Sequence, residues 1–165
     1  MARRSTTGSG PVQVWLGDEV LTSDARATTA SPDRVWQVLA NGRLFAQWAI
    51  GATQVCEVDD GWPEVGSRLH HAMGRGRFAL RSETRVLAST SAQLLRLRTE
   101  AWPTAGSQLT ITLEPTCWGT RLRIEEVTVA GADHVVPPTV HSMLLQWRSA
   151  QALRGLALLA EGLEP

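Results

Sequence analysis

The sequence predicts an α+β fold in which a long antiparallel β-meander is covered by a C-terminal helix. Between residues 61 and 129, five strand-like segments alternate apolar with charged residues and are separated by Gly, Pro and small polar residues. Residues 140–162 are helical by composition. Because side chains on a strand point alternately to opposite faces, the alternation predicts a sheet with a charged outer face and an apolar inner face.

The elements before the meander start with a Thr-rich strand over residues 20–30. A Ser-Pro pair at 31–32 then predicts a helix start, because the serine can cap the helix and proline has a preset helical φ at the first helical position. Asn41-Gly42 predicts the end of that helix. A second short helix follows at Leu44–Trp48, and we expect the two helices to form an elbow against the edge of the sheet. Residues 12–16 are too short to classify.

The strands of the meander are expected at 53–58, 68–73, 78–86, 95–100, 109–114 and 121–129. The turn signals between them are about 10 to 15 residues apart, which fits a meander rather than βαβ units. Together with the strand at 20–30, this makes seven strands.

The C-terminal helix is apolar on more than one side, so we expect it to lie across the sheet and also to touch the elbow. Small residues at Ser149, Ala152 and Gly155 would leave space between helix and sheet. Glycine costs about 1 kcal/mol of helix propensity relative to alanine, so Gly155 is expected to have a packing or cavity role.

Length and charge exclude several classes of protein. The chain has 165 residues, with 16 basic and 16 acidic side chains. A chain of this length can bury a core as one domain without disulfides or metal. The balanced charge, with no basic stripe, argues against nucleic acid as a partner. We expect residues 1–11 to form a disordered tail and residues 12–165 to form a single domain.

Location and cysteine chemistry are predicted from what the sequence lacks. It has no run of about 18 apolar residues, and its N-terminus lacks the apolar core of a signal peptide. This predicts a cytoplasmic protein without membrane insertion. Cys56 and Cys117 are far apart and form no CxxC pair. We therefore expect free, buried thiols rather than a disulfide or a metal site.

Four stretches carry a resemblance to a known family. They are SPDRVWQVLANGRLFAQW at 31–48, GWPEVGSRLHHAMG at 61–74, WGTRLRIEEVTVAG at 118–131 and LRGLALLAEG at 153–162. In this order and spacing, the chain resembles the polyketide cyclase/dehydrase group of the START-like, Bet v 1-like (SRPBCC) superfamily over residues 20–162. The resemblance implies a helix-grip fold, in which a curved seven-stranded antiparallel sheet wraps a long C-terminal helix around a cavity for an apolar ligand. Two short helices follow the first strand.

The resemblance does not imply one reaction, because members of this superfamily include aromatase/cyclases, lipid carriers, hormone receptors and co-chaperone-like proteins. Candidate residues must therefore come from the pattern itself. The polar residues in phase with the apolar inner positions are Ser82, Thr84, Thr99, Glu126 and Thr128, and His71 is in phase with Leu69 and Met73.

Glu126 is the most informative of these residues, and two interpretations are open. If the alternation continues through the last strand, its carboxylate points inward, where it needs a partner, water or a raised pKa. It could then orient a ligand hydroxyl or act as a base near His71. Alternatively, a β-bulge at Glu125-Glu126 turns Glu126 to solvent, an interpretation that we slightly favour.

The candidate catalytic residues are Glu126, His71 and Thr84. His71 could move a proton, but a hydrogen-bonded strand histidine is the simpler explanation, which we favour. No base lies at a recognisable spacing from the serines and threonines, which excludes a serine-hydrolase site. A metal site of His71, His134 and His141 is disfavoured because a Pro-Pro pair separates the last two. No metal or cofactor is expected.

A pocket between sheet and helix would be lined by residues of the inner face, the elbow and the last helix. The candidate ligand-binding residues are Trp36, Trp48, Met73, Phe78, Leu80, Ser82, Leu97, Thr99, Ile111, Ile124, Met143 and Trp147. The three tryptophans could flank a pocket mouth or belong to the core.

The leading functional hypothesis is binding of a small hydrophobic molecule, lipid-like, aromatic or polyketide-like, in this cavity. If the protein is an enzyme, a cyclisation or dehydration is expected, in which Glu126, His71 and Thr84 move protons. One alternative is a non-catalytic carrier or sensor. Another is a co-chaperone-like interaction module, which would have a filled core and an exposed apolar patch. The sequence is compatible with a monomer or a homodimer.

Overall fold

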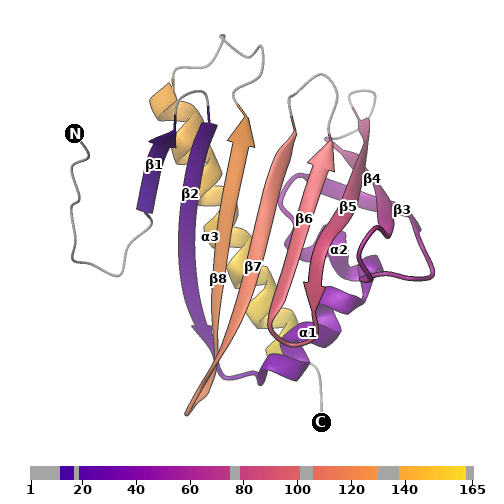
Figure 1. Cartoon of the computed structure of the whole chain (residues 1–165), viewed down its shortest axis with the longest axis vertical. Helices are drawn as coiled ribbons and strands as arrows, with labels where there is room; N and C mark the ends of the chain where they lie inside the picture. The colour runs from indigo at the N-terminus through magenta and orange to yellow at the C-terminus, as the bar shows by residue number, and fades with distance from the viewer. Residues whose placement is uncertain (1–11, 17–18, 75–78, 101–105, 130–137, 163–165) are drawn as a thin grey trace.

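A single antiparallel sheet with one long helix against its inner face dominates the structure (Figure 1). The structure is a computed structural model that describes residues 12–16, 19–74, 79–100, 106–129 and 138–162. In the described residues the sheet order is β1-β2-β8-β7-β6-β5-β4-β3. The elements are β1 (Val12–Leu16), β2 (Glu19–Thr28), α1 (Pro32–Ala40), η1 (Gly42–Leu44), α2 (Phe45–Trp48), β3 (Ala52–Val58), β4 (Arg68–Met73), β5 (Leu80–Thr90), β6 (Leu94–Glu100), β7 (Ser107–Thr116), β8 (Gly119–Val129) and α3 (Pro138–Gly162).

This architecture confirms the helix-grip fold. The short helices follow β2, and the long helix α3 is the last element. The sheet has one strand more than predicted. The additional strand is β1, the stretch that was too short to classify, and it pairs with β2 as an antiparallel hairpin. The tail expected at 1–11 lies outside the described residues.

The helical elbow forms where the Ser-Pro pair predicted it. The Ser31 side chain accepts a hydrogen bond from the Arg34 amide at 3.4 Å, and Pro32 occupies the first turn of α1. Asn41 then accepts from the Arg43 amide at 3.2 Å, which caps η1. The short helix η1 and α2 contact β3, so the elbow lies against the edge strand as expected.

The loop between β3 and β4 is attached to the elbow through Trp62. Its indole Nε1 donates a buried hydrogen bond to the carbonyl of Leu39 at 3.1 Å. Gly42 lies beneath this contact, where a Cβ atom would be 2.7 Å from Cγ1 of Val58. A side chain at position 42 would therefore require the side chains of Val58, Leu69 and Trp62 to shift.

The long helix α3 packs directly on the elbow at Gly155. A Cβ atom there would be 3.1 Å from Cα of Trp48 and 3.3 Å from the carbonyl oxygen of Gln47. Gly155 is therefore explained by close packing of two helices, the first of the two roles expected for it.

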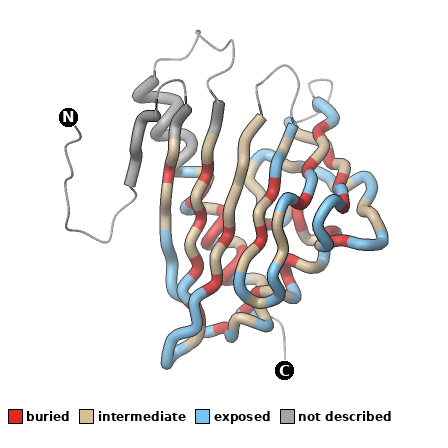
Figure 2. Tube along the Cα trace, viewed as in Figure 1, coloured by how far each residue is buried: buried red, intermediate tan, exposed pale blue. Residues whose placement is uncertain are grey.

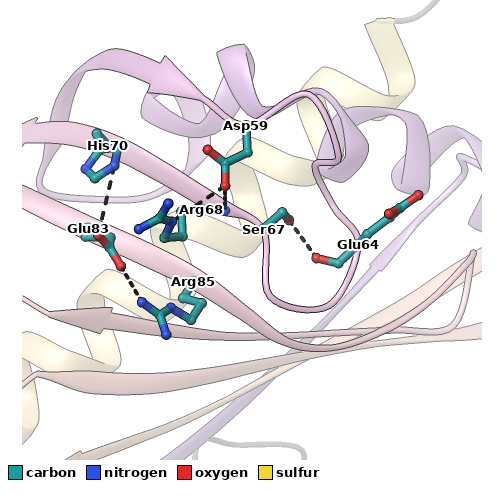
Figure 3. A network of polar contacts seen from close by, with 7 residues as sticks. All are labelled: Asp59, Glu64, Ser67, Arg68, His70, Glu83 and Arg85. Carbon is teal, nitrogen blue, oxygen red and sulfur yellow. Dashed lines mark hydrogen bonds and ion pairs between the residues drawn. The ribbon is translucent and has the colours of Figure 1, made fainter.

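The outer face of the sheet carries the predicted charges, and buried positions alternate with more exposed ones along its strands (Figure 2). On β4, β5 and the loop before them, acidic and basic side chains form a surface network (Figure 3). Glu83 lies 3.2 Å from Arg85 and 3.9 Å from His70, and Arg68 pairs with Asp59 at 3.7 Å. Such exposed pairs contribute little stability each, so this face mainly keeps the sheet hydrated.

The cysteines are free, but the expectation that they are buried is wrong. Cys56 is exposed on the edge strand β3, and Cys117 is exposed at the tip of the β7–β8 hairpin. Within the described ranges, none of the helices is both long and apolar enough to cross a lipid bilayer.

Candidate functional site

Buried polar side chains gather on the elements that face α3 and the elbow. Those that bear on the site are Thr22 on β2, His71 on β4, Ser82 and Thr84 on β5, Glu126 on β8 and Ser149 on α3. The apolar inner positions Leu97, Ile111 and Ile124, each at most 1% exposed, lie on the strands between the two ends of this set. The site is thus an apolar surface with polar groups placed at a few points.

Glu126 points into the interior and is 5% exposed. The β7–β8 register runs one residue against one residue from Ser107↔Thr128 to Thr116↔Gly119. The β-bulge that we slightly favoured is therefore wrong, because a bulge would place two residues of β8 opposite one of β7. On β2, the residue directly opposite Glu126 is Thr22, which is 1% exposed.

His71 is buried on β4, with 3% of its surface exposed and its ring 5.1 Å from the ring of Phe45 on α2. Burial is the main cause that lowers the pKa of His71 from 6.5 to about 4, and the neighbouring charge of His70 acts in the same direction. The imidazole is therefore neutral at pH 7.

The hydroxyls of β5 and β6 already have partners. Thr84 and Thr99 share a hydrogen bond of 2.9 Å between their Oγ1 atoms, and Ser82 donates to the carbonyl of Glu100 at 2.9 Å. These groups fix the pairing of the two strands in addition to offering polar points to the interior.

Four buried polar atoms, in contrast, have no hydrogen-bond partner in the described part of the chain. They are Oγ1 of Thr22, Nε1 of Trp48, Nδ1 of His71 and Oγ of Ser149. Buried polar groups in native proteins nearly always find a partner in the protein, in ordered water or in a ligand. The four unpaired groups lie on four different elements, β2, α2, β4 and α3.

Comparison with known proteins places this arrangement in a family. Residues 29–149 match the family model described as "Activator of Hsp90 ATPase homolog 1-like protein". The chain belongs to this family. The predicted SRPBCC superfamily, which also includes the polyketide cyclase/dehydrase group, is thereby confirmed.

Several solved structures are similar to the fold of this chain. Protein CV1439 from Chromobacterium violaceum is 22% identical with a TM-score of 0.63, over 86% of this chain and 97% of that one. The Zhui aromatase/cyclase from Streptomyces sp. R1128 is 16% identical with a TM-score of 0.68, over 87% and 94%. Ara h 8.0201 is 12% identical with a TM-score of 0.68, over 88% and 99%. The sequence matches no curated protein.

Within this AHSA1-like fold, the three candidate catalytic residues are not all neighbours. Thr84 and His71 lie on adjacent strands, but β8, which carries Glu126, is separated from β4 by β7, β6 and β5. Four strand spacings correspond to about 19 Å along the sheet. The structure thus divides the polar groups into a carboxylate end, with Glu126 and Thr22, and an imidazole end, with His71.

The candidate ligand-binding residues fall into three groups. Trp48, Ser82, Leu97, Ile111 and Ile124 are buried, and Trp36, Met73 and Thr99 are partly buried. The expectation that Leu80 lies inside is wrong: it is 46% exposed because it is the first residue of β5, at the open end of the β4–β5 pair. Trp147 is 57% exposed on the outer side of α3, so it does not line the interior. Phe78 and the side chains of Met143 and Thr128 lie outside the described residues, as do His134 and the side chain of His141.

Two residues of the site were not singled out from the sequence. Thr22 was missed because the pairing of the first and last long strands cannot be read from alternation within one strand. Phe45 was within the expected second helix, and its spacing of three residues from Trp48 is the signal that could have identified it. The two rings form an edge-to-face pair with centroids 5.0 Å apart.

An open cleft of about 480 Å³ lies outside this site, between α1, η1 and the loop after β3. It includes Arg43, Asp59, Asp60 and Trp62, and none of the candidate site residues. Asp59 is already engaged by Arg68. In the ranges that the structure describes, no three His, Cys, Asp or Glu side chains lie together in a way that could hold a metal ion.

Proposed function

We propose that the protein binds a small, largely apolar molecule between the inner face of the sheet and α3. The observation that carries this proposal is the set of unpaired buried atoms on Thr22, Trp48, His71 and Ser149. Ligand sites are typically apolar surfaces with a small number of polar groups that fix orientation, which is the composition of this inner face. The fold is shared with an aromatase/cyclase.

Binding is better supported than catalysis. A general base works best when its pKa is near the working pH, and the pKa of His71, at about 4, makes it a weak base. The Thr84 hydroxyl is held by Thr99, and Glu126 lies several strands away from His71. The protein is therefore proposed as a ligand-binding protein of the carrier or sensor type, and a cyclase or dehydratase activity as the more specific alternative.

The test is direct titration with fatty acids, flavonoids and aromatic polyketides, followed by tryptophan fluorescence and calorimetry. Ser149→Leu adds bulk on the buried side of α3, and its exposed neighbour provides the matched control Ala150→Leu. We expect wild type and Ala150→Leu to bind one class of these compounds and Ser149→Leu to bind it at least tenfold more weakly. Absence of binding by any class, in a folded protein, would refute the proposal.

The enzymatic alternative is separated from simple binding by turnover of a ligand found in that screen. Under the enzymatic alternative, Glu126→Gln and His71→Ala abolish product formation while the dissociation constant changes little. Unchanged turnover in both variants excludes the two residues as catalytic, and no turnover by wild type leaves the carrier function.

A protein-interaction role is the second candidate, favoured by the family description and by two exposed residues on α3. Trp147 is 57% and Leu158 is 58% exposed, and eleven residues bring them to the same side of a helix. The test is ATP hydrolysis by a purified Hsp90-type ATPase with and without this protein. Stimulation that is lost in Trp147→Ser would establish this role, whereas unchanged hydrolysis would exclude it.

A further inference from the structure

The outer face of the sheet carries two parallel rows of like charges that run across neighbouring strands. The register places Arg68 of β4 opposite Arg85 of β5, and Arg85 opposite Arg98 of β6. Two residues away along the same strands, Glu83 of β5 lies opposite Glu100 of β6. We call these sets the arginine row and the glutamate row. The strand pairing thus assembles a charge pattern that is not visible along the sequence.

Within one molecule, the contacts across the strands are unfavourable. Like charges directly opposite each other on a sheet are destabilising. The rows are compensated along each strand, because Arg85 lies 3.2 Å from Glu83 (Figure 3) and Arg98 lies 3.3 Å from Glu100. These four side chains are between 28% and 70% exposed, and exposed ion pairs contribute little stability each. Their charged groups are therefore accessible to a partner.

A second copy of the chain has the charge pattern that complements these rows. In a two-fold dimer, the same surface patch of each subunit meets itself. If two sheets lie face to face, a two-fold axis that runs between the rows and parallel to them exchanges the rows. Arg85 then faces the partner's Glu83, and Arg98 faces the partner's Glu100. The helix α3 lies on the opposite face of the sheet and leaves this contact open (Figure 1).

The contact would join the separate ion pairs into larger networks. A guanidinium has about five N–H donors in a planar fork, so Arg85 can bind its own Glu83 and the partner's Glu83 at the same time. Charges in a network contribute more than isolated exposed pairs. A contact limited to β5 and β6 is small, and interfaces below about 1,200 Å² are typical of transient complexes. The expected dimer is therefore weak and sensitive to salt.

We infer that this face is the contact surface of a weak homodimer, in which the arginine row of each subunit faces the glutamate row of the other. A second copy fits better than a purely acidic partner, because both signs are present in the arrangement that the two-fold axis exchanges. Arg68 is already paired with Asp59 at 3.7 Å, so the contact is assigned to β5 and β6. Arg81 and Arg96 flank the rows at the rim, where salt screens their charges. The inference is independent of the ligand site on the inner face.

Sedimentation equilibrium of the wild-type protein at pH 7 tests the dimer. We expect the mass to rise above the 17.9 kDa of the monomer at about 200 µM protein in about 50 mM salt. It should return to the monomer value in about 500 mM salt, because the contact is electrostatic. A monomer under both conditions would overturn the inference.

Charge-reversal variants test whether the rows form the contact. Glu83→Arg with Glu100→Arg makes both rows positive, whereas Arg85→Glu with Arg98→Glu makes both rows negative. We expect each variant alone to self-associate at least about tenfold more weakly than wild type, and an equimolar mixture to associate at least as tightly as wild type. If each variant alone dimerises as tightly as wild type, the inference fails.

Two controls separate the row contact from the general attraction between oppositely charged proteins. Glu114→Arg with Glu125→Arg, and Arg121→Glu with Arg123→Glu, make the same changes in net charge on β7 and β8. Each control should self-associate within about threefold of wild type, because exposed charges outside the contact are screened. Effects as large as those of the row variants would overturn the inference. A monomeric wild type that binds polyglutamate, and loses it when both rows are negative, would overturn it in favour of an acidic partner.

Discussion

Glu161 near the end of α3 accepts hydrogen bonds from Oγ1 of Thr28 at 2.6 Å and from the amide of Thr29 at 3.2 Å. These bonds attach the last turn of the long helix to the end of β2. The hydrogen bond from Thr28 is the main cause that lowers the pKa of Glu161, and the Thr29 amide adds to it. One carboxylate therefore fixes where the helix ends on the sheet.

Replacement of this carboxylate should loosen the helix end. We expect Glu161→Ala to lower the free energy of unfolding by about 1 kcal/mol, because the side chain is solvent-exposed and its hydrogen bonds are partly screened. Since the folded-state pKa of Glu161 is depressed, its contribution is present at neutral pH and is lost as the pH falls through that pKa. Urea denaturation at pH 7 and pH 3 should show a larger difference between wild type and variant at pH 7 than at pH 3. A difference of the same size at both would contradict the role of the charge.

The indole of Trp62 should be required for its hydrogen bond and not only for its bulk. Trp62→Phe leaves the buried carbonyl of Leu39 without its donor, so we expect a loss of about 1–3 kcal/mol. The matched substitution is Trp118→Phe, at a side chain that is 85% exposed, where a change within about 0.5 kcal/mol is expected. Equal effects of the two substitutions in chemical denaturation would show that the bond is unimportant.

Sequence reasoning recovered the elements whose signals are local. The Ser31 cap, the Asn41-Gly42 stop and the β4 bounds were read from neighbouring residues and are confirmed. The inner positions of β6, β7 and β8 followed from alternation, because a strand buried on one face has a strict period of two.

The remainder depends on contacts between distant segments. Thr22 faces Glu126 across a pairing of more than 100 residues in sequence separation, which no local pattern specifies. Leu80 has the phase of an inner residue, but the strand end on which it lies is open. Cysteine is usually a buried residue type, so burial was predicted for Cys56 and Cys117. Both are exposed, because one lies on an edge strand and the other at a hairpin tip. Alternation predicts which face of the sheet a side chain lies on, but not which other element covers that face.

Close packing of α3 on the elbow should make Gly155 intolerant of a side chain. A Cβ atom there would meet Cα and Cβ of Trp48 at 3.1 and 3.3 Å, so a branched residue must push the two helices apart. We expect Gly155→Val to lower the unfolding free energy by about 1–3 kcal/mol. Gly162→Val is the control within the same helix, since a Cβ atom at Gly162 has nothing within 4 Å. The thermal midpoint should fall for the first variant alone; equal midpoints would refute the packing role.

The burial of His71 should make the protein less stable in mild acid. Its pKa is about 4 in the folded state against 6.5 ordinarily, so below pH 6.5 the unfolded chain binds a proton that the folded protein does not. The contribution is thus neutral above pH 6.5 and increasingly destabilising down to about pH 4, by roughly 2–3 kcal/mol in total. Unfolding free energies measured by urea between pH 7.5 and 4.5 should therefore decline more steeply for wild type than for His71→Phe, which cannot take up the proton. His70→Phe, with its ring on the hydrated face beside Glu83, should retain the steep decline. Parallel curves for wild type and His71→Phe would show that the imidazole is not desolvated as the structure places it.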